Sequence, residues 1–231
     1  MPEEWIPKTE LGRKVLNGEI KSLEEAFLNG YRIMEPEIVD LLMPNLKTEV
    51  FKIGGTSGKG GGIRRVPVRR TTRMHKSGRR FKISVMVAVG NENGWIGVGM
   101  GEGPMGKQRD VYEKAVREAK KNIIPIVRGC GSWECRCGTP HSIPLIVEGK
   151  CGSVRVKLMP APKGLGLCAP DEIKKLLRLA GIQDIWLKSR GDTRTRMNFV
   201  TAVFNALRQL SKYKIDEEFK KLSGMNYGEV A

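Results

Sequence analysis

The sequence predicts an α+β protein of two small domains preceded by a helical extension. The chain has 231 residues, and 40% of them are hydrophobic, which is enough for one large or two small packed domains. Period-two alternation, typical of strands, and period-3.6 spacing, typical of helices, follow each other between residues 63 and 211. Strands followed by helices in two successive groups favour two α+β units.

Residues 1–50 are predicted to form a helical acidic extension. They hold ten acidic and six basic residues. Ser22 suits the N-cap of a short helix because Glu25 follows three positions later, and Glu37 to Leu42 shows a second helical pattern that Pro44 ends. Fifty residues bury little core, so we expect this extension to pack on a neighbouring molecule.

Residues 51–62 are predicted to form a glycine-rich basic loop, because residues 54–62 show no periodicity. The wider stretch 52–82 contains eleven Lys and Arg residues and no acid. We expect regular structure to begin only at Phe81.

Residues 63–126 are predicted to form the first α+β domain. Apolar residues alternate with other residues from Phe81 to Val89, which indicates a strand. Gly90 to Gly94 suits a turn, and Trp95 to Met100 suits the returning strand of a hairpin. Lys107 to Asn122 then has the spacing of an amphipathic helix.

Residues 127–142 are predicted to be a Cys-rich linker loop, residues 143–211 a C-terminal α+β domain, and residues 212–231 a polar tail. The expected elements of the C-terminal domain are strands at 143–147 and 153–158 joined at Gly149-Lys150, a helix that begins near Pro170 and ends at Gly181, a strand at 182–188, and a helix at 193–210.

The charge of the chain favours a polyanionic partner. Forty-one Lys and Arg residues face 25 Asp and Glu residues, a formal net charge of +16. A membrane span is not expected because no run of 18 apolar residues exists, and Met1 to Trp5 lack the features of a leader, so we expect a cytosolic protein that binds nucleic acid. The alternative is that the basic stretch is a solvated loop that only aids solubility.

Two glycine motifs suggest nucleotide sites, but neither fits. The alternating glycines from Gly97 to Gly103 lie within a strand, whereas a dinucleotide site needs a strand, a spaced glycine turn and a helix. They are more consistent with close approach of another backbone, from the protein or from RNA. Gly54 to Lys59 lacks the glycine spacing and the hydroxyl residue of a Walker loop.

The five cysteines are an odd number, which argues against a disulfide framework. Cys130, Cys135, Cys137 and His141 offer four zinc ligands within twelve residues, although the spacing is not that of a common zinc finger. A possible structural zinc and a loop of free thiols are both open interpretations. No other cofactor is indicated.

Catalytic groupings are not apparent. Only His75 and His141 occur, and no Ser-His-Asp set or carboxylate pair is indicated. His75 lies among basic residues and is interpreted as an RNA contact, and Asp192 as an ion-pair partner of the arginines around it.

Several distinct motifs are spread over roughly residues 55–210. They are Arg73 to Phe81, Val89-Gly90-x3-Gly94, Gly97-x-Gly99-x-Gly101, Lys114 to Asn122, Cys151 to Val154, Pro160 to Gly164, Ala180 to Asp184, and Ser189 to Gly191. Together these motifs resemble the ribosomal small-subunit protein five family, and the acidic extension and Cys-rich loop resemble its archaeal type.

The resemblance implies a first domain like double-stranded-RNA-binding domains and a C-terminal left-handed βαβ domain. It also implies a non-enzymatic cytoplasmic protein in the ribosome, at the head–body junction of the small subunit beside small-subunit proteins four and eight, with roles in accuracy and at the messenger entrance. The predicted RNA contacts are Lys59, Arg64, Arg65, Arg69, Arg70, Arg73, His75, Lys76, Arg79, Arg80, Lys107, Lys114, Lys163, Arg190, Arg194 and Arg196. Two alternatives stay open: an RNA-binding regulator outside the ribosome, and a small kinase-like enzyme.

Overall fold

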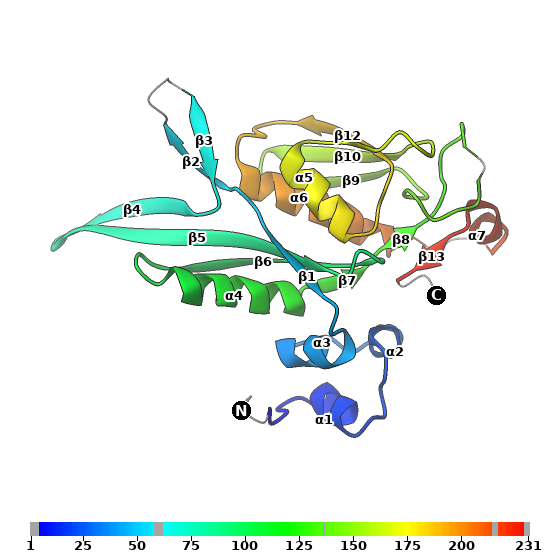
Figure 1. Ribbon diagram of the computed structural model, residues 1–231, viewed down its shortest axis with the longest axis horizontal. Helices are drawn as coiled ribbons and strands as arrows, with labels where there is room; N and C mark the ends of the chain where they lie inside the picture. The colour runs from blue at the N-terminus through cyan, green and yellow to red at the C-terminus, as the bar shows by residue number, and fades with distance from the viewer. Residues whose placement is uncertain (1–4, 58–61, 136, 214–216, 229–231) are drawn as a thin grey trace.

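The computed structural model describes residues 5–57, 62–135, 137–213 and 217–228. Figure 1 shows a central twisted sheet with one long helix below it and a second α+β unit above it. Three short helices of the N-terminal extension lie below the sheet beside α4, and a long hairpin projects from one end of the molecule. Lys59 lies outside the described residues.

The central sheet is built on a long hairpin of β5 (Gly78–Gly90) and β6 (Trp95–Pro104), which confirms the predicted pair of strands. The sheet order is β1 (Lys47–Val50), β5, β6, β7 (Ile123–Pro125). A further strand, β4 (Arg69–His75), pairs with the outer half of β5. Regular structure therefore begins well before Phe81, and that prediction was wrong. β4 lacks apolar alternation because every residue in it is exposed.

Helix α4 (Gln108–Lys121) covers one face of the sheet and confirms the predicted helix. The alternating glycines of β6 let it approach closely. A Cβ atom on Gly97 would lie 2.1 Å from the Ala119 carbonyl oxygen, and one on Gly99 would lie 2.2 Å from the Ala119 nitrogen. The close neighbour of these glycines is therefore the helix backbone, and RNA has no room on this face.

The C-terminal unit is a four-stranded sheet with two helices. Its strand order is β11 (Leu167–Cys168), β12 (Ile185–Arg190), β10 (Val154–Pro160), β9 (Val147–Cys151). β11 and β12 are parallel, so α5 (Asp171–Leu179) makes the crossover of a βαβ unit between them. α6 (Arg196–Leu210) packs on β9 and β10.

The predicted turn at Gly149-Lys150 was wrong. Val147–Cys151 is one continuous strand, and the chain turns at Gly152, which has a φ of 59°. Gly149 serves close packing, because a Cβ atom there would lie 2.1 Å from the Ala202 carbonyl oxygen of α6. Residues 143–146 precede the strand.

The N-terminal extension contains α1 (Glu10–Leu16), α2 (Leu23–Leu28) and α3 (Pro36–Leu42). The predicted cap is confirmed, because the Glu25 amide donates to the Ser22 hydroxyl at 3.2 Å. The extension buries its apolar residues within the chain itself and not on a neighbouring molecule. Its helices share a core with Trp95 and Ile123 of the central sheet, and its last residues form β1.

Two other segments are more ordered than predicted. Gly54–Ser57 (β2) pairs with Ile63–Val66 (β3), so part of the predicted loop 51–62 is a hairpin strand. The predicted tail contains α7 (Glu217–Ser223) and β13 (Asn226–Tyr227), and β13 pairs with β8 (Val127–Arg128). Both strands form through backbone pairing, which needs no apolar periodicity.

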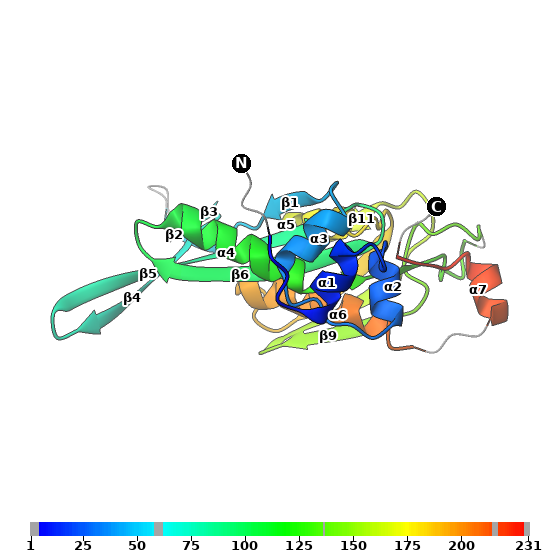
Figure 2. The same cartoon turned by 90° about the horizontal axis from the view of Figure 1, so that it is seen from below.

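One continuous core joins the two α+β units. Met86 and Ile96 of the central sheet pack in the same cluster as Leu176 and Leu179 of α5. The central sheet is thus buried by α4 on one face and by the C-terminal unit on the other (Figure 2). No helix in the described parts of the chain is long and apolar enough to cross a membrane.

Candidate nucleic-acid interface and metal cluster

The hairpin of β4 and the outer half of β5 extends away from the body in both views (Figures 1 and 2). Every residue from Arg69 to Arg80 is exposed. Strand register places Arg73 directly opposite Arg80. Side chains of directly opposed residues lie on the same face about 5 Å apart at Cβ, and like charges there are unfavourable. The hairpin therefore carries an internal repulsion.

The described residues provide no acid to relieve this repulsion. No salt bridge among them reaches Arg69, Arg70, Arg73, Lys76, Arg79 or Arg80. The contacts of these arginines are with neutral groups. Arg70 lies 5.2 Å from the Phe81 ring centre, Arg80 donates to the Ser77 hydroxyl at 3.1 Å, and Arg69 lies 3.1 Å from the Met197 sulfur. The guanidinium groups keep donors free for an anion.

Three arginines lie where this hairpin meets the body, and we call them the arginine neck. Arg69, Arg194 and Arg196 line a cleft of about 220 Å³ between β4 and the start of α6. The Arg196 Nε atom is buried without a hydrogen-bond partner among the described residues. Arg65 of β3, half-buried, lines an adjacent cleft together with Arg196 and with the acids Asp171 and Glu172, whereas Arg64 on the same strand is exposed. Four predicted residues thus gather at one place: Arg65, Arg69, Arg194 and Arg196.

A second basic surface lies on the C-terminal sheet, on the side away from α6. Register places Arg155 opposite Arg190 and Lys157 opposite Lys188. Only Arg190 of these was predicted. The other three follow from alternation along β10 and β12, but their convergence depends on the strand register, which the sequence does not give. Lys157 is partly neutralised by Glu148 at 3.3 Å.

The remaining predicted contacts are dispersed. Lys107 is exposed just before α4, Lys114 is exposed in the middle of that helix, and His75 is exposed beside the hairpin turn. Asp192 does not pair with the arginines around it, and that prediction was wrong. Its carboxylate accepts from the Arg194 amide at 3.2 Å and the Thr195 hydroxyl at 3.0 Å, so it organises the turn before α6.

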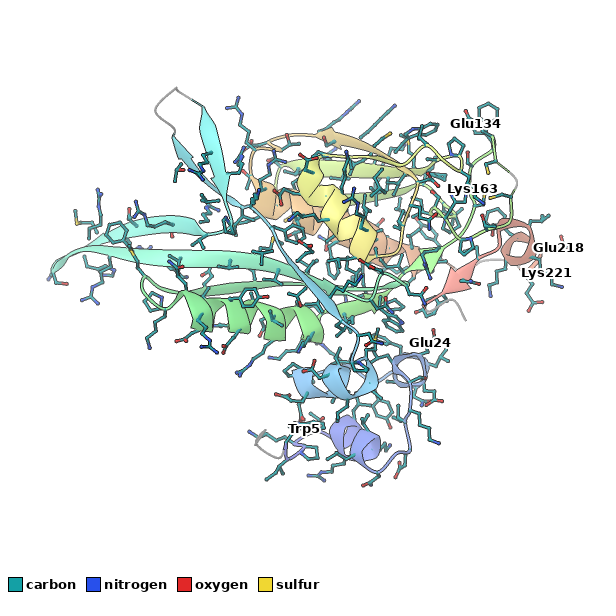
Figure 3. The ribbon with its side chains drawn as sticks, viewed as in Figure 1. Trp5, Glu24, Glu134, Lys163, Glu218 and Lys221 are labelled. Carbon is teal, nitrogen blue, oxygen red and sulfur yellow. The ribbon has the colours of Figure 1, made fainter. Side chains whose placement is uncertain are left out.

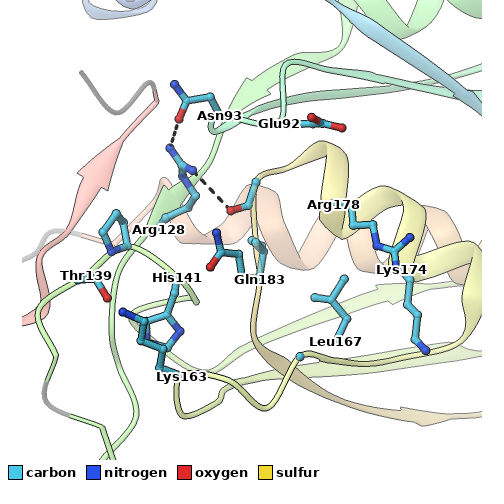
Figure 4. A pocket seen from close by; sticks show the side chains of 14 residues that line it. Glu92, Asn93, Arg128, Thr139, His141, Lys163, Leu167, Lys174, Arg178 and Gln183 are labelled. Atoms are coloured by element: carbon cyan, nitrogen blue, oxygen red, sulfur yellow. Dashed lines mark hydrogen bonds between the residues drawn. The ribbon is translucent and has the colours of Figure 1, made fainter.

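A pocket of about 870 Å³ lies where the two units and the Cys-rich loop meet (Figure 4). Buried Arg128 donates to the Asn93 side chain at 2.8 Å and to the Gly181 carbonyl at 3.5 Å. Burial lowers the pKa of Arg128. Three further cations line the pocket: Lys163, Lys174 and Arg178. Arg128 therefore ties the β5–β6 turn to the end of α5, in a cationic setting.

The Cys-rich loop brings its four predicted ligands together. The ligand atoms of Cys130, Cys135, Cys137 and His141 all lie within 4.8 Å of one another. Cys130 and His141 are buried, whereas Cys137 is exposed. The cluster could hold a metal ion. Cys151 and Cys168 belong to the C-terminal sheet, outside this cluster.

His141 is oriented by a buried carboxylate. Its Nδ1 atom lies 2.8 Å from Asp184 Oδ2, and its Nε2 atom is buried with no hydrogen-bond partner among the described residues. The other carboxylate oxygen of Asp184 accepts from the amides of Gly164 and Gly166. Because a carboxylate accepts from Nδ1–H, the Nε2 lone pair is left free, as in many metal-binding histidines. Sequence inspection missed Asp184, 43 residues away.

The thiols of the cluster differ in proton affinity. Burial alone raises the pKa of Cys137, but hydrogen bonds from Thr139 and from the thiols of Cys135 and Cys130 lower that pKa to about 6. Burial raises the pKa of Cys130. The lowered pKa of Cys137 favours the thiolate, which is the form of cysteine that binds a metal ion.

Comparison with known sequences identifies the family. The family described as "Ribosomal protein S5, N-terminal domain" matches residues 63–127, and "Ribosomal protein S5, C-terminal domain" matches residues 149–221. The chain belongs to the ribosomal protein S5 family. It is thus a ribosomal protein and not an enzyme, which removes the kinase alternative.

Relatives in the family cover almost the whole chain. A protein of Pyrobaculum islandicum is 52% identical over 91% of this chain and 96% of its own length. A protein of Nanoarchaeum equitans is 49% identical over 99% and 97%, and one of Methanocaldococcus jannaschii is 46% identical over the same shares. All three are named "Small ribosomal subunit protein uS5". The predicted archaeal type is confirmed.

Proposed function

We propose that this protein is a structural constituent of the small ribosomal subunit and binds ribosomal RNA with the β4–β5 hairpin and the arginine neck. One observation carries the proposal. Arg73 faces Arg80 across the hairpin, and no acid among the described residues neutralises either. RNA phosphates between and around these side chains would remove the repulsion and release counterions.

The mechanism is electrostatic clamping by a rigid spacer. The hairpin reaches RNA beyond the body, whereas Arg155, Lys188 and Arg190 face a different direction, on the C-terminal sheet. The shared core holds these surfaces at a fixed separation. Two RNA elements bound to them would keep a constant mutual orientation, and recognition would rest on shape and phosphates.

The setting that follows from the family resemblance is the head–body junction. We propose that the protein stabilises the head orientation there, contacts small-subunit proteins four and eight, contributes to accuracy and approaches the messenger entrance. The ribosome in the cytoplasm is the expected location. Arg64, Arg65, Arg69 and Arg70 are the candidates for contacts near the messenger.

The salt dependence of RNA binding tests the assigned surface. Replacing four hairpin arginines with Ala should make the negative slope of the logarithm of the RNA-binding constant against the logarithm of salt concentration shallower by about three. Each phosphate contact contributes about 0.7–0.9 to that slope. The four are Arg69, Arg70, Arg79 and Arg80. The matched control removes four exposed cations from the N-terminal extension: Lys8, Arg13, Lys21 and Arg32. An unchanged slope in the hairpin variant would refute the assigned surface.

The alternative of a regulator outside the ribosome makes a different prediction for cell extracts. A ribosomal constituent sediments with small subunits at moderate ionic strength, whereas a free regulator stays near the top of the gradient. Detection of most of the protein in the free fraction would favour the regulator.

We further propose that the cluster binds one structural zinc ion. The orphaned Nε2 atom of His141 and three converging thiols are the donors that Zn²⁺ prefers in closed tetrahedral sites. Metal analysis of the pure protein should give one zinc per chain, and Cys137→Ser should abolish it. Cys168→Ser, which removes a thiol outside the cluster, is the control. Zinc well below one equivalent would end this proposal.

A further inference from the structure

The C-terminal segment, residues 217–228, docks against both ends of the Cys-rich loop. At the start of the loop, the Cys130 amide donates to the Ser223 carbonyl at 2.8 Å. At its far end, Gly224 lies so close to Gly138 that a Cβ atom on Gly224 would be 1.7 Å from the Gly138 carbonyl oxygen. In Figure 3, Glu134 of the loop and Glu218 and Lys221 of α7 lie at the same end of the molecule.

The end of the segment also contacts the body: Gly228 is buried, its amide donates to the Ile126 carbonyl at 3.4 Å, and its carbonyl accepts from Arg128 at 3.3 Å. β13 contributes only two residues to its pairing with β8, and most described residues of α7 are exposed. Among its apolar side chains, Leu222 is 76% exposed and only Met225 packs against the main core. A helix of seven residues is unstable by itself. The position of α7 and of Gly224 therefore depends largely on the surface that the loop offers, whereas residues 226–228 are held by the body.

The loop, in turn, is closed by the cluster. A two-residue bridge between Gly129 and Ser142 joins its base. None of the described residues from Cys130 to His141 belongs to a hydrophobic core cluster. The convergence of the four ligand side chains therefore links the Cys130 end of the loop to the residues beside Gly138, both of which the segment contacts.

We propose that metal binding by Cys130, Cys135, Cys137 and His141 seats residues 217–225 on the Cys-rich loop, at the junction of the two units. This inference rests on the proposed zinc site and gives that site its purpose. The ion holds the Cys130 end and the Gly138 end of the loop in place, and these two ends contact the segment. Asp184 is the positioning residue, because it holds the His141 ring through Nδ1.

Hydrogen exchange on the full-length protein tests the proposal, with zinc counted in the same sample by native mass spectrometry. Removing zinc with a chelator should speed exchange of amides in residues 217–225 at least tenfold, and adding zinc back should reverse it. Amides of α6 provide the internal reference and should keep their rates. The amide of Cys130 should follow the segment, since it donates to Ser223.

The outcomes separate the two proposals. Stoichiometric zinc with unchanged exchange of residues 217–225 would leave the zinc site standing and overturn the seating. Zinc below stoichiometry would overturn both. If chelation also unfolds α6, a variant of the zinc-loaded protein tests the seating of the segment instead.

That variant is Gly224→Val, which unseats the segment and keeps all four ligands. Coupling between two sites is reciprocal, so the zinc affinity measured by chelator competition should fall by the same factor, at least tenfold. Gly18→Val is the matched control. Gly18 has a similar positive φ of 74°, but nothing lies within 4 Å of its Cβ position. An unchanged affinity in Gly224→Val would overturn the seating.

Discussion

The opposition of Arg73 and Arg80 predicts that stability and RNA affinity change in opposite directions when one arginine is reversed in charge. Arg73→Glu or Arg80→Glu replaces a repulsive cross-strand pair by an attractive one. Such pairs are worth about 0.2–1 kcal/mol, and both side chains are fully solvated, so the gain should be about 0.5–1 kcal/mol. At about 2–4 °C per kcal/mol for a chain of this size, the melting temperature should rise by about 1–4 °C.

RNA binding should fall in the same variants. Each lost phosphate contact removes about 0.7–0.9 from the salt slope, and the added carboxylate repels the backbone. The double variant Arg73→Glu/Arg80→Glu restores a like-charged pair, so its melting temperature should return to that of the unmodified protein while its RNA affinity becomes the lowest of the set. Thermal unfolding and salt titrations of RNA binding measure the two effects.

Arg32→Glu is the matched control, since it makes the same charge change on an exposed residue of the extension. This control variant should leave the salt slope of RNA binding unchanged, and its melting temperature should not rise above that of the unmodified protein. Destabilisation by both single hairpin variants, or RNA binding equal to that of the unmodified protein, would refute the argument that the hairpin stores repulsion for a polyanion.

Three further predictions concern the fold and the cluster. Gly99→Ala should lower the free energy of unfolding by about 3 kcal/mol in denaturant unfolding, because its Cβ would lie 2.2 Å from the α4 backbone. Gly103→Ala should lower it clearly less, because its Cβ would meet only a side-chain methyl group. Equal losses of unfolding free energy in the two variants would contradict this prediction. In metal-free protein, alkylation of Cys137 should reach half its maximal rate near pH 6 and rise with pH as the thiolate forms, and a midpoint above pH 8 would contradict the hydrogen bonds assigned to it. Asp184→Asn should weaken zinc binding about tenfold to a hundredfold in chelator competition by disturbing His141, and an unchanged affinity would remove Asp184 from the site.

Local patterns in the sequence predicted the elements that bury a periodic face. The alternation from Phe81 to Val89 gave a strand, and the spacing of Val111, Ala115 and Ala119 gave α4, because burial against a core leaves that period in the residue choice. β1 (Lys-Thr-Glu-Val) escaped prediction, since it joins the sheet edge through its backbone and half of it is solvated.

For the candidate sites too, the sequence predicted the residues that lie close together along the chain and missed the pairs that are far apart. The basic hairpin and the four metal ligands are close in sequence, so composition and spacing found them. The partnership of His141 with Asp184, and the alignment of Arg155 with Arg190, join residues that are 43 and 35 positions apart. Such pairs depend on strand register and on the path of the chain, which no local pattern encodes.

Crosslinking on reconstituted small subunits tests the central claim most directly. A photoreactive side chain placed at Thr72 or Met74, in the exposed hairpin, should crosslink to ribosomal RNA, and the same probe at Glu19 of the extension should give far less RNA adduct. Crosslinks from the hairpin to protein alone, or none at all, would contradict an RNA-filled environment around its arginines.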